Sequence, residues 1–156
     1  MNRKGFTLIE LLIVLTVIGI LVAIVIPSFR GMQQEGNLTK AEQELNTLQA
    51  AVESYYRHNG HSYPPDGAGT TPMAYQDSLI NQKYFRIISQ YLKDPFNNNK
   101  LYSYTILKDV NGIDYYVVWS NGINNVKDWQ WLNEEGKIKI SADKDDIIRT
   151  NALIGN

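Results

Sequence analysis

The N-terminal part of the chain begins with a long apolar run. It extends from Phe6 to Ile26, and among these 21 residues only Thr7, Glu10 and Thr16 are polar. A helix of this length rises roughly 31 Å, which is enough to cross the hydrocarbon core of a bilayer. The pattern therefore predicts a membrane-spanning helix.

The residues that flank this run predict its orientation and its fate. Arg3 and Lys4 stand immediately before it, so the positive-inside rule places the N-terminus in the cytoplasm and everything after Pro27 across the membrane. A secretory signal peptide would have a shorter apolar core ending in small residues, whereas this run ends in Ile-Val-Ile-Pro-Ser. We therefore expect the apolar helix to be retained and the bulk of the protein to be extracytoplasmic.

One acid interrupts the apolar run. Glu10 is placed where it would lie inside the hydrocarbon, and an ionisable residue there is costly unless it has a partner. A candidate partner is a free amine at the start of the same segment in a neighbouring copy. Such an amine would arise if the peptide bond after Gly5 were cut.

A different pattern follows between Ser28 and Asn59, where the chain becomes amphipathic. Six apolar positions recur at intervals of three and four residues and form one stripe along a helix. They are Leu38, Ala41, Leu45, Leu48, Val52 and Tyr55. The other faces carry charged residues, and Asn59-Gly60 is a typical helix end. The stripe predicts a helix docked on a folded partner; a coiled-coil seam is the alternative, but the strand-forming sequence that follows favours a sheet.

The rest of the chain predicts an irregular loop, short helices and then strands. Residues 61–72 are rich in Ser, Pro, Gly and Thr, as loops are, and residues 78–91 predict one or two short helices begun near Asp77. From Leu101 onward the apolar period changes to two. The predicted strands are 101–107, 114–119 and 137–141, and the loop around Asn111-Gly112 is longer than a two-residue hairpin turn. These patterns predict an α+β head in which the amphipathic helix packs on a small antiparallel sheet within 101–141.

Composition narrows the possible classes of protein. Of 156 residues, about 100 remain for a folded head once the apolar helix is set aside, which is enough for one small domain. The formal net charge is -1, and removing Arg3 and Lys4 would bring it to -3, the wrong sign for a nucleic-acid-binding protein. Cysteine is absent, so the head cannot use a disulfide, and a metal ion is another way to stabilise a small domain.

The start of the chain resembles a known processing motif. Lys4-Gly5-Phe6-Thr7-Leu8-Ile9-Glu10 resembles the leader and cleavage motif of type IV prepilins and of the pseudopilins of type II secretion, and Gly19 and Pro27 fall where those helices carry a glycine and a proline. The resemblance implies cleavage between Gly5 and Phe6 by prepilin peptidase and N-methylation of Phe6. It also implies that the apolar helix serves first as a membrane anchor and then as a filament core. Glu10 would pair with the terminal amine of Phe6 in an adjacent subunit.

Two segments near the C-terminus suggest a metal site. Residues 120–126, Ser-Asn-Gly-Ile-Asn-Asn-Val, and the later Asp143-Lys-Asp-Asp-Ile147 offer the oxygen ligands that calcium prefers. Their order is similar to that of the major pseudopilin of type II secretion, as are Asn59-Gly60-x-x-Tyr63-Pro64 and Asp94-Pro95-Phe96. The ligands implied by this resemblance are the Ser120 hydroxyl, the Asn121 and Val126 carbonyls, the Asn124 side chain, and the Asp145 and Asp146 carboxylates.

The chain departs from that pattern in two places. Asn124 stands where the family has an acid, and the segment from Lys127 to Lys144 is a longer insertion than is usual there. Asp128 or Asp143 could substitute for the missing acid. The alternative interpretation of these residues is a solvated acidic turn without a metal.

Other candidate sites are weaker. His58 and His61 have a spacing that can bind zinc, but zinc usually takes four ligands, so we expect a surface pair. The three tryptophans and ten tyrosines could form a binding patch, although aromatic residues on strands more often belong to a core. No catalytic triad or phosphate-binding loop is recognisable, and we expect no catalytic residues and no enzymatic activity.

Together these features predict a structural subunit of a type II secretion pseudopilus with a type IV pilin-like fold. The expected organisation is a leader at 1–5, a transmembrane and filament-core helix at 6–27, and a periplasmic head at 28–156 that includes the amphipathic helix 28–59. The protein would span the inner membrane once, and its expected partners are further copies of itself, other pseudopilins, prepilin peptidase and an inner-membrane assembly platform. The alternatives are a type IV pilus pilin for adhesion or twitching and a membrane-anchored periplasmic enzyme or binding protein.

Overall fold

A computed structural model describes residues 5–66, 74–80, 87–141 and 145–155. The chain divides into two compact units, residues 1–37 and 38–156. Helix α1, Leu8–His58, contributes to both of them. The boundary after Asn37 separates two compact units and does not show where a membrane would end. The division at Pro27 between membrane helix and head therefore stays a prediction.

The first unit is the N-terminal part of α1 with the residues that precede it. All of its large apolar side chains from Phe6 to Ile26 are exposed, the least of them by 47%. Within the described part of the chain, α1 is the one helix that is long and apolar enough to cross a membrane. Taken by itself, this segment has no protein core to bury its apolar surface, as expected of a helix that lies in lipid or against other copies.

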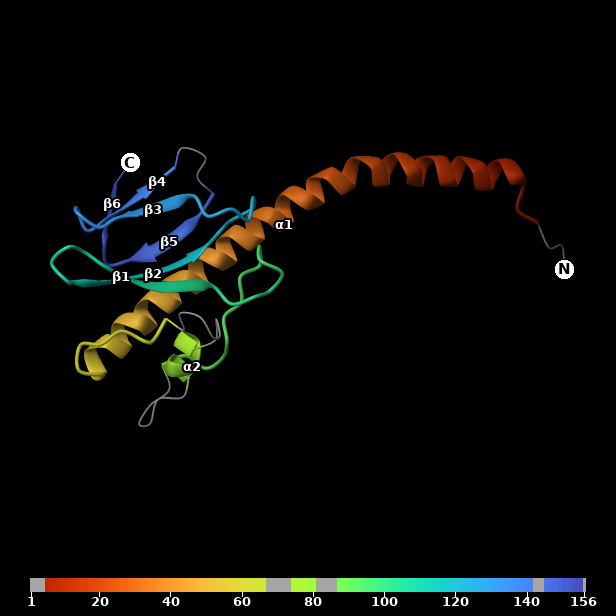
Figure 1. Cartoon of the computed structure of the whole chain (residues 1–156). Helices are drawn as coiled ribbons and strands as arrows, with labels where there is room; N and C mark the ends of the chain where they lie inside the picture. Colours follow the sequence, from red (N-terminus) through yellow and green to blue (C-terminus); the bar gives the residue numbers. More distant parts are fainter. Residues whose placement is uncertain (1–4, 67–73, 81–86, 142–144, 156) are drawn as a thin grey trace. The chain divides into compact units, whose positions relative to one another are not determined.

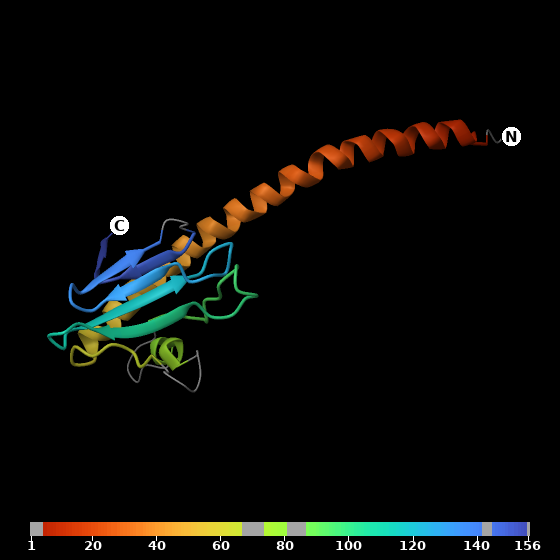
Figure 2. The ribbon, with the colours of Figure 1, turned by 45° about the horizontal axis from the view of Figure 1, so that its top comes forward.

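The second unit contains two three-stranded sheets. One sheet consists of β1 (Ser103–Lys108), β2 (Asp114–Ser120) and β5 (Ile147–Thr150), all antiparallel, in the order β1-β2-β5. The other consists of β3 (Trp129–Leu132), β4 (Lys137–Ile140) and β6 (Leu153–Gly155), with β4 and β6 parallel. Figures 1 and 2 show both sheets and the short helix α2, Ala74–Ile80, within this unit.

The side chains of β2 connect two hydrophobic cores. Tyr116 and Val118 point into the first core together with the apolar stripe of α1, where Ala41, Leu45 and Leu48 are completely buried. Val117 lies in the second core, which contains Ile138 of β4. Because alternate side chains of a strand point to opposite faces, the first sheet has α1 packed on one face and residues of the second sheet packed on the other.

Polar side chains fasten this part of α1 to the sheet. The phenol of Tyr102 donates to Glu44 over 2.8 Å, and Tyr116 on β2 donates to Glu53 over the same distance. Burial, together with the neighbouring carboxylates, raises the pKa of both phenols, so they stay protonated donors at neutral pH. Glu44 and Glu53 are nine residues apart, about half a turn out of phase, so the two bonds hold α1 on opposite sides of the helix and at two heights along it.

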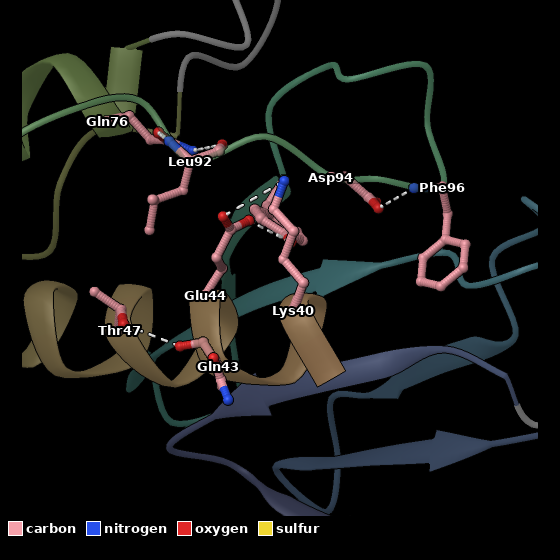
Figure 3. A network of polar contacts seen from close by, with 9 residues as sticks. Lys40, Gln43, Glu44, Thr47, Gln76, Leu92, Asp94 and Phe96 are labelled. Atoms are coloured by element: carbon pink, nitrogen blue, oxygen red, sulfur yellow. Dashed lines mark hydrogen bonds and ion pairs between the residues drawn. The ribbon is translucent and has the colours of Figure 1, made fainter. Parts of the chain in front are cut away.

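A side chain of α2 binds the backbone of the segment that follows this helix. Figure 3 shows the buried side chain of Gln76, which accepts the Leu92 N–H over 2.8 Å and donates to the Leu92 carbonyl over 3.0 Å. In the same view the carboxylate of Asp94 accepts the Phe96 N–H over 2.9 Å. The Gln76 side chain thus pairs the backbone N–H and the carbonyl of Leu92, as a neighbouring strand would, and buried backbone groups need such partners.

The α+β fold with a long N-terminal helix is confirmed, and several details of the prediction are corrected. Helix α2 begins at Ala74 rather than near Asp77, and residues 87–91 are not helical; residues 81–86 and 67–72 lie outside the described residues. Leu101 forms only an isolated bridge to Lys93, so β1 starts at Ser103. The single antiparallel sheet predicted within 101–141 was wrong, because the strands form two sheets and one pair is parallel.

Candidate functional site

The first candidate site is the start of α1. Thr7 precedes the helix, and its carbonyl accepts the N–H of Leu11 over 3.3 Å. The Glu10 carboxylate accepts the Thr7 N–H over 2.8 Å and the Thr7 hydroxyl over 2.7 Å, while the Glu10 N–H donates to Thr7 Oγ1 over 3.3 Å. This reciprocal arrangement is a capping box. Glu10 therefore has a hydrogen-bonding partner inside its own chain.

The capping box was missed in the sequence analysis, although Thr-x-x-Glu before an apolar run is its usual signature. Both bonds that Glu10 accepts end on Oε2. The expected pairing of Glu10 with the amine of Phe6 in another subunit stays a prediction. Phe6 is 85% exposed, and a Cβ at Gly5 would meet no atom within 4 Å. The peptide bond between Gly5 and Phe6 is therefore accessible to a processing enzyme, as far as the described residues of this chain are concerned.

The second candidate site lies where β2 ends and β5 begins. Ser120 is paired with Ile147 in the sheet, so the loop that leaves β2 and the acids that precede β5 must meet at the same edge. The carboxylates of Asp128, Asp145 and Asp146 gather there, with one oxygen of each within 4.8 Å of the others. This cluster of three acids is called the acidic site below.

Each acid of this site accepts a hydrogen bond from a described residue. The Asn124 N–H donates to Asp145 Oδ2 over 2.7 Å, and the Asp128 N–H donates to Asp146 Oδ2 over the same distance. The Asn124 amide group donates to Asp128 Oδ2 over 3.1 Å. In contrast, Oδ1 of Asp145 and Oδ1 of Asp146 are buried and have no hydrogen-bond partner among the described residues.

The electrostatics of the acidic site disfavour the charged form of its carboxylates. Burial, followed by the charges of Asp128 and Asp145, raises the pKa of Asp146 to about 6, although a backbone bond and Lys127 act in the opposite direction. Buried carboxylate oxygens without donors are costly unless a cation or a proton compensates them. The residues therefore fit a hard divalent cation, for which carboxylate oxygens are the preferred ligands.

A glycine makes room for this arrangement. Gly122 has a φ of +62°, and a Cβ there would lie 2.2 Å from the carbonyl oxygen of Asp145 and 2.8 Å from its carboxyl carbon. A side chain at residue 122 would push Asp145 out of the site. Glycine is needed here both for its conformation and for the close approach of the second segment.

The structure places the other predicted ligands around the acidic site with different partners. The Ser120 hydroxyl is buried and accepts the Gly122 N–H over 3.2 Å, and the Asn121 side chain accepts the indole N–H of Trp119 over 2.7 Å. The Asn124 oxygen accepts the N–H of Val126 over 2.7 Å, and Val126 itself is exposed. Asp143 lies outside the described residues. That these groups ligate a metal stays a prediction.

The weaker candidates have structural partners. Nδ1 of His58 lies 2.7 Å from the Ser54 carbonyl, and the ring of His61 packs edge-on against Tyr56. Neither histidine belongs to the potential metal-binding group found among the described residues. Trp129 is 3% exposed and packs in the second core with Trp119, so these two aromatic residues belong to the core.

An apolar N-terminal helix that begins with a prepilin-like motif and continues as the spine of a small β-sheet head defines a membrane-anchored protein of the type IV pilin-like class. Residues 1–26 match the model of the prokaryotic N-terminal methylation motif. Residues 29–134 match the model of the type II secretion system protein G. The chain belongs to the type II secretion system protein G family. This match ends before Asp145 and Asp146.

Curated relatives agree with this assignment. The type II secretion system core protein G of Vibrio cholerae serotype O1 is 27% identical over 124 residues, which are 78% of this chain and 83% of the relative. The core protein G of Escherichia coli K12 is 28% identical over 102 residues, 63% and 70% of the two chains. A fimbrial protein of Pseudomonas aeruginosa is 48% identical, but only over 52 residues, 33% of this chain and 34% of the relative. No solved structure matches the chain.

Proposed function

We propose that this protein is the repeating structural subunit of a type II secretion pseudopilus, a helical filament that helps to drive protein export across the outer membrane. The observation that carries the proposal is the apolar run from Phe6 to Ile26, whose large apolar side chains are all exposed and which contains a single acid, Glu10. Lipid can cover this surface before assembly, and other copies of the same helix can cover it afterwards. The protein would act mechanically, by polymerising, and not as an enzyme.

The proposed location is the inner membrane, with the head in the periplasm. Arg3 and Lys4 precede the apolar helix and favour a cytoplasmic N-terminus. The proposed partners are further copies of the chain, other pseudopilins, prepilin peptidase, and an inner-membrane platform on which the filament grows. Within the filament, Oε1 of Glu10 would be the acceptor for the methylated amine of Phe6 in the next subunit, because the two bonds from Thr7 end on Oε2.

Replacement of Gly5 by valine is expected to block removal of the leader. Glycine leaves the backbone beside the Phe6 bond open, and a branched side chain there would hinder its entry into a peptidase site. Mass spectrometry of the purified protein should find at least about tenfold less mature protein than in the wild type, and the wild type should begin at N-methylated Phe6. Gly19→Ala is the control, since a Cβ at Gly19 meets no atom within 4 Å, and it should be processed normally. Normal processing of Gly5→Val would contradict the proposed cleavage site.

We also propose that the acidic site binds calcium. Asp145 and Asp146 would hold the ion, with Ser120, Asn121, Asn124 and Val126 as the further ligands implied by the sequence. Calcium accepts six to eight oxygens in flexible geometry, whereas magnesium requires a tighter octahedron. The ion would compensate the two buried carboxylate oxygens that have no partner among the described residues, and it would link the loop after β2 to the start of β5.

Removal of calcium is expected to lower the melting temperature of the head. A ligand that binds only the folded state at about 100 times its Kd stabilises it by about 2.7 kcal/mol, which corresponds to several degrees for a domain of this size. The full-length protein in detergent micelles should melt lower in EDTA, and an excess of calcium should restore the melting temperature where the same concentration of magnesium does not. Superimposable melting curves in all three conditions would exclude the calcium site.

A type IV pilus fibre is the second candidate function. It is favoured by the fimbrial relatives, whose identity to this chain reaches 48% over 52 residues. Deletion of the gene separates the two candidates. Loss of secreted proteins with surface fibres intact supports the pseudopilus, whereas loss of surface fibres with normal secretion supports the pilus.

A further inference from the structure

The acidic site contains one carboxylate from the segment between Lys127 and Lys144. Asp128 directly precedes β3, and its carbonyl accepts the N–H of Ser141, directly after β4, over 2.7 Å, so the residue is fixed at the open end of the β3–β4 hairpin. In the next pair along this hairpin, Trp129 stands opposite Ile140. The position of Asp128 is therefore set by a strand pair and not by a free loop.

The side chain and backbone of Asp128 join the two halves of the acidic site. Its N–H donates to Asp146 Oδ2, and its Oδ2 accepts the amide of Asn124. Asn124 is neutral, and its oxygen is engaged by the Val126 N–H over 2.7 Å. At the residue where an acid was expected, the chain thus offers an amide that points at another acid.

The charge of the acidic site is consistent with Asp128 supplying the negative charge that Asn124 lacks. With Asn124 neutral, Asp145 and Asp146 alone would carry two negative charges, and Asp128 raises the number to three. Among the described residues, Lys127 is the cation that acts on Asp146, and its ammonium lies 3.7 Å from the centre of the Trp129 ring. Within the described part of the chain, this one lysine does not compensate three carboxylates, two of which have a buried oxygen without a donor there.

We infer that Asp128 is a calcium ligand supplied by the β3–β4 insertion, and that it replaces the acid missing at Asn124. This inference rests on the proposed calcium site. It assigns the insertion a role in metal binding: the hairpin brings its own carboxylate to the ion, so calcium would tie β3 and β4 to β2 and β5 across the two sheets. The acid that the insertion brings would then compensate for the amide at residue 124.

The test compares Asp128→Asn with the wild type in the full-length protein in detergent, using calcium titration calorimetry. The substitution keeps the size of the side chain and removes its charge, so calcium affinity should fall at least about tenfold. Glu134→Gln is the matched control, because it removes one acid from the turn of the same insertion without touching the acidic site, and it should bind calcium as the wild type does. Adding Asn124→Asp to Asp128→Asn should restore the affinity to within about threefold of the wild type.

Melting curves separate a ligand from a merely structural residue. In EDTA, Asp128→Asn should melt at or above the wild-type temperature, because one of three mutually repelling carboxylates is gone; in calcium, it should melt below the wild type. A loss of the same size in both conditions would assign Asp128 a structural role and overturn the inference. Wild-type affinity in Asp128→Asn would also overturn it while leaving the calcium site in place, whereas absence of calcium binding by the wild type would remove both. None of these three outcomes bears on the proposal that the protein is a pseudopilus subunit.

Discussion

Replacement of Glu10 by alanine is expected to leave the protein in the membrane and to prevent its assembly. Insertion should not suffer, since the substitution removes the one acid from the apolar run. Assembly should suffer, since the amine of Phe6 in the next subunit would enter an apolar contact without a counter-charge. Leaving one partner of a buried ion pair alone is strongly unfavourable, so we expect at least about tenfold less filament. Alkaline extraction of membranes measures insertion, and electron microscopy of sheared filaments measures assembly.

The capping box makes a second variant informative. Glu10→Gln can still accept both hydrogen bonds from Thr7, but it carries no charge. If the charge pairs with a neighbouring amine, glutamine should fail almost as completely as alanine. If Glu10 acts only by capping its own helix, glutamine should assemble normally, and the intersubunit pairing would be wrong. Thr16→Val is the control, since the Thr16 hydroxyl bonds within its own helix to the Leu12 carbonyl over 2.8 Å, and it should assemble as the wild type does.

The parts of the fold that were predicted correctly are those with a long periodic signal. The stripe on α1 is buried at Ala41, Leu45, Leu48 and Val52, because seven-residue spacing repeated over five turns leaves little choice of face. Strand β2 was recognised because both of its faces are buried and its sequence is therefore almost continuously apolar or aromatic. In both elements local pattern and tertiary packing agree.

The missed strands are short, and their pairing depends on distant residues. β5 has four residues and β6 has three, which is too little for a period of two to stand out. β6 pairs in parallel with β4, a contact that follows from the path of the chain and not from the sequence of either strand. Trp129 and Trp131 of β3 signalled a strand or a core equally well, and only the pairing with β4 decides between them.

The acidic site was only partly predictable for a similar reason. Asp145 and Asp146 were expected to meet the loop after Ser120, and the register of β2 against β5 brings them together. Asp128 was only one of two possible substitutes, because its approach depends on how the β3–β4 hairpin folds back. The interaction of Glu10 with Thr7, in contrast, is local, and a search for capping boxes would have found it.

Replacement of Gly122 by alanine is expected to be among the most destabilising single changes in the head. The left-handed conformation of residue 122 costs a residue with a side chain roughly 1 to 2 kcal/mol, and relieving the overlap with the Asp145 backbone costs about 1 to 3 kcal/mol more. For a head of this size the melting temperature should fall by roughly 10 °C or more. Differential scanning calorimetry of the full-length protein in detergent, in the presence of calcium, measures the change.

Gly60→Ala separates the two causes of this loss. Gly60 has a φ of +63°, almost the same as that of Gly122, but a Cβ there would meet no atom within 4 Å. It should therefore show only the smaller conformational cost and keep its response to calcium. Gly122→Ala should lose that response as well, because the displaced Asp145 no longer shares the site with Asp128 and Asp146. Equal losses of stability in the two variants would mean that the close approach of residues 122 and 145 contributes nothing to stability. That result would contradict the claim that glycine at 122 is needed to bring Asp145 into the acidic site.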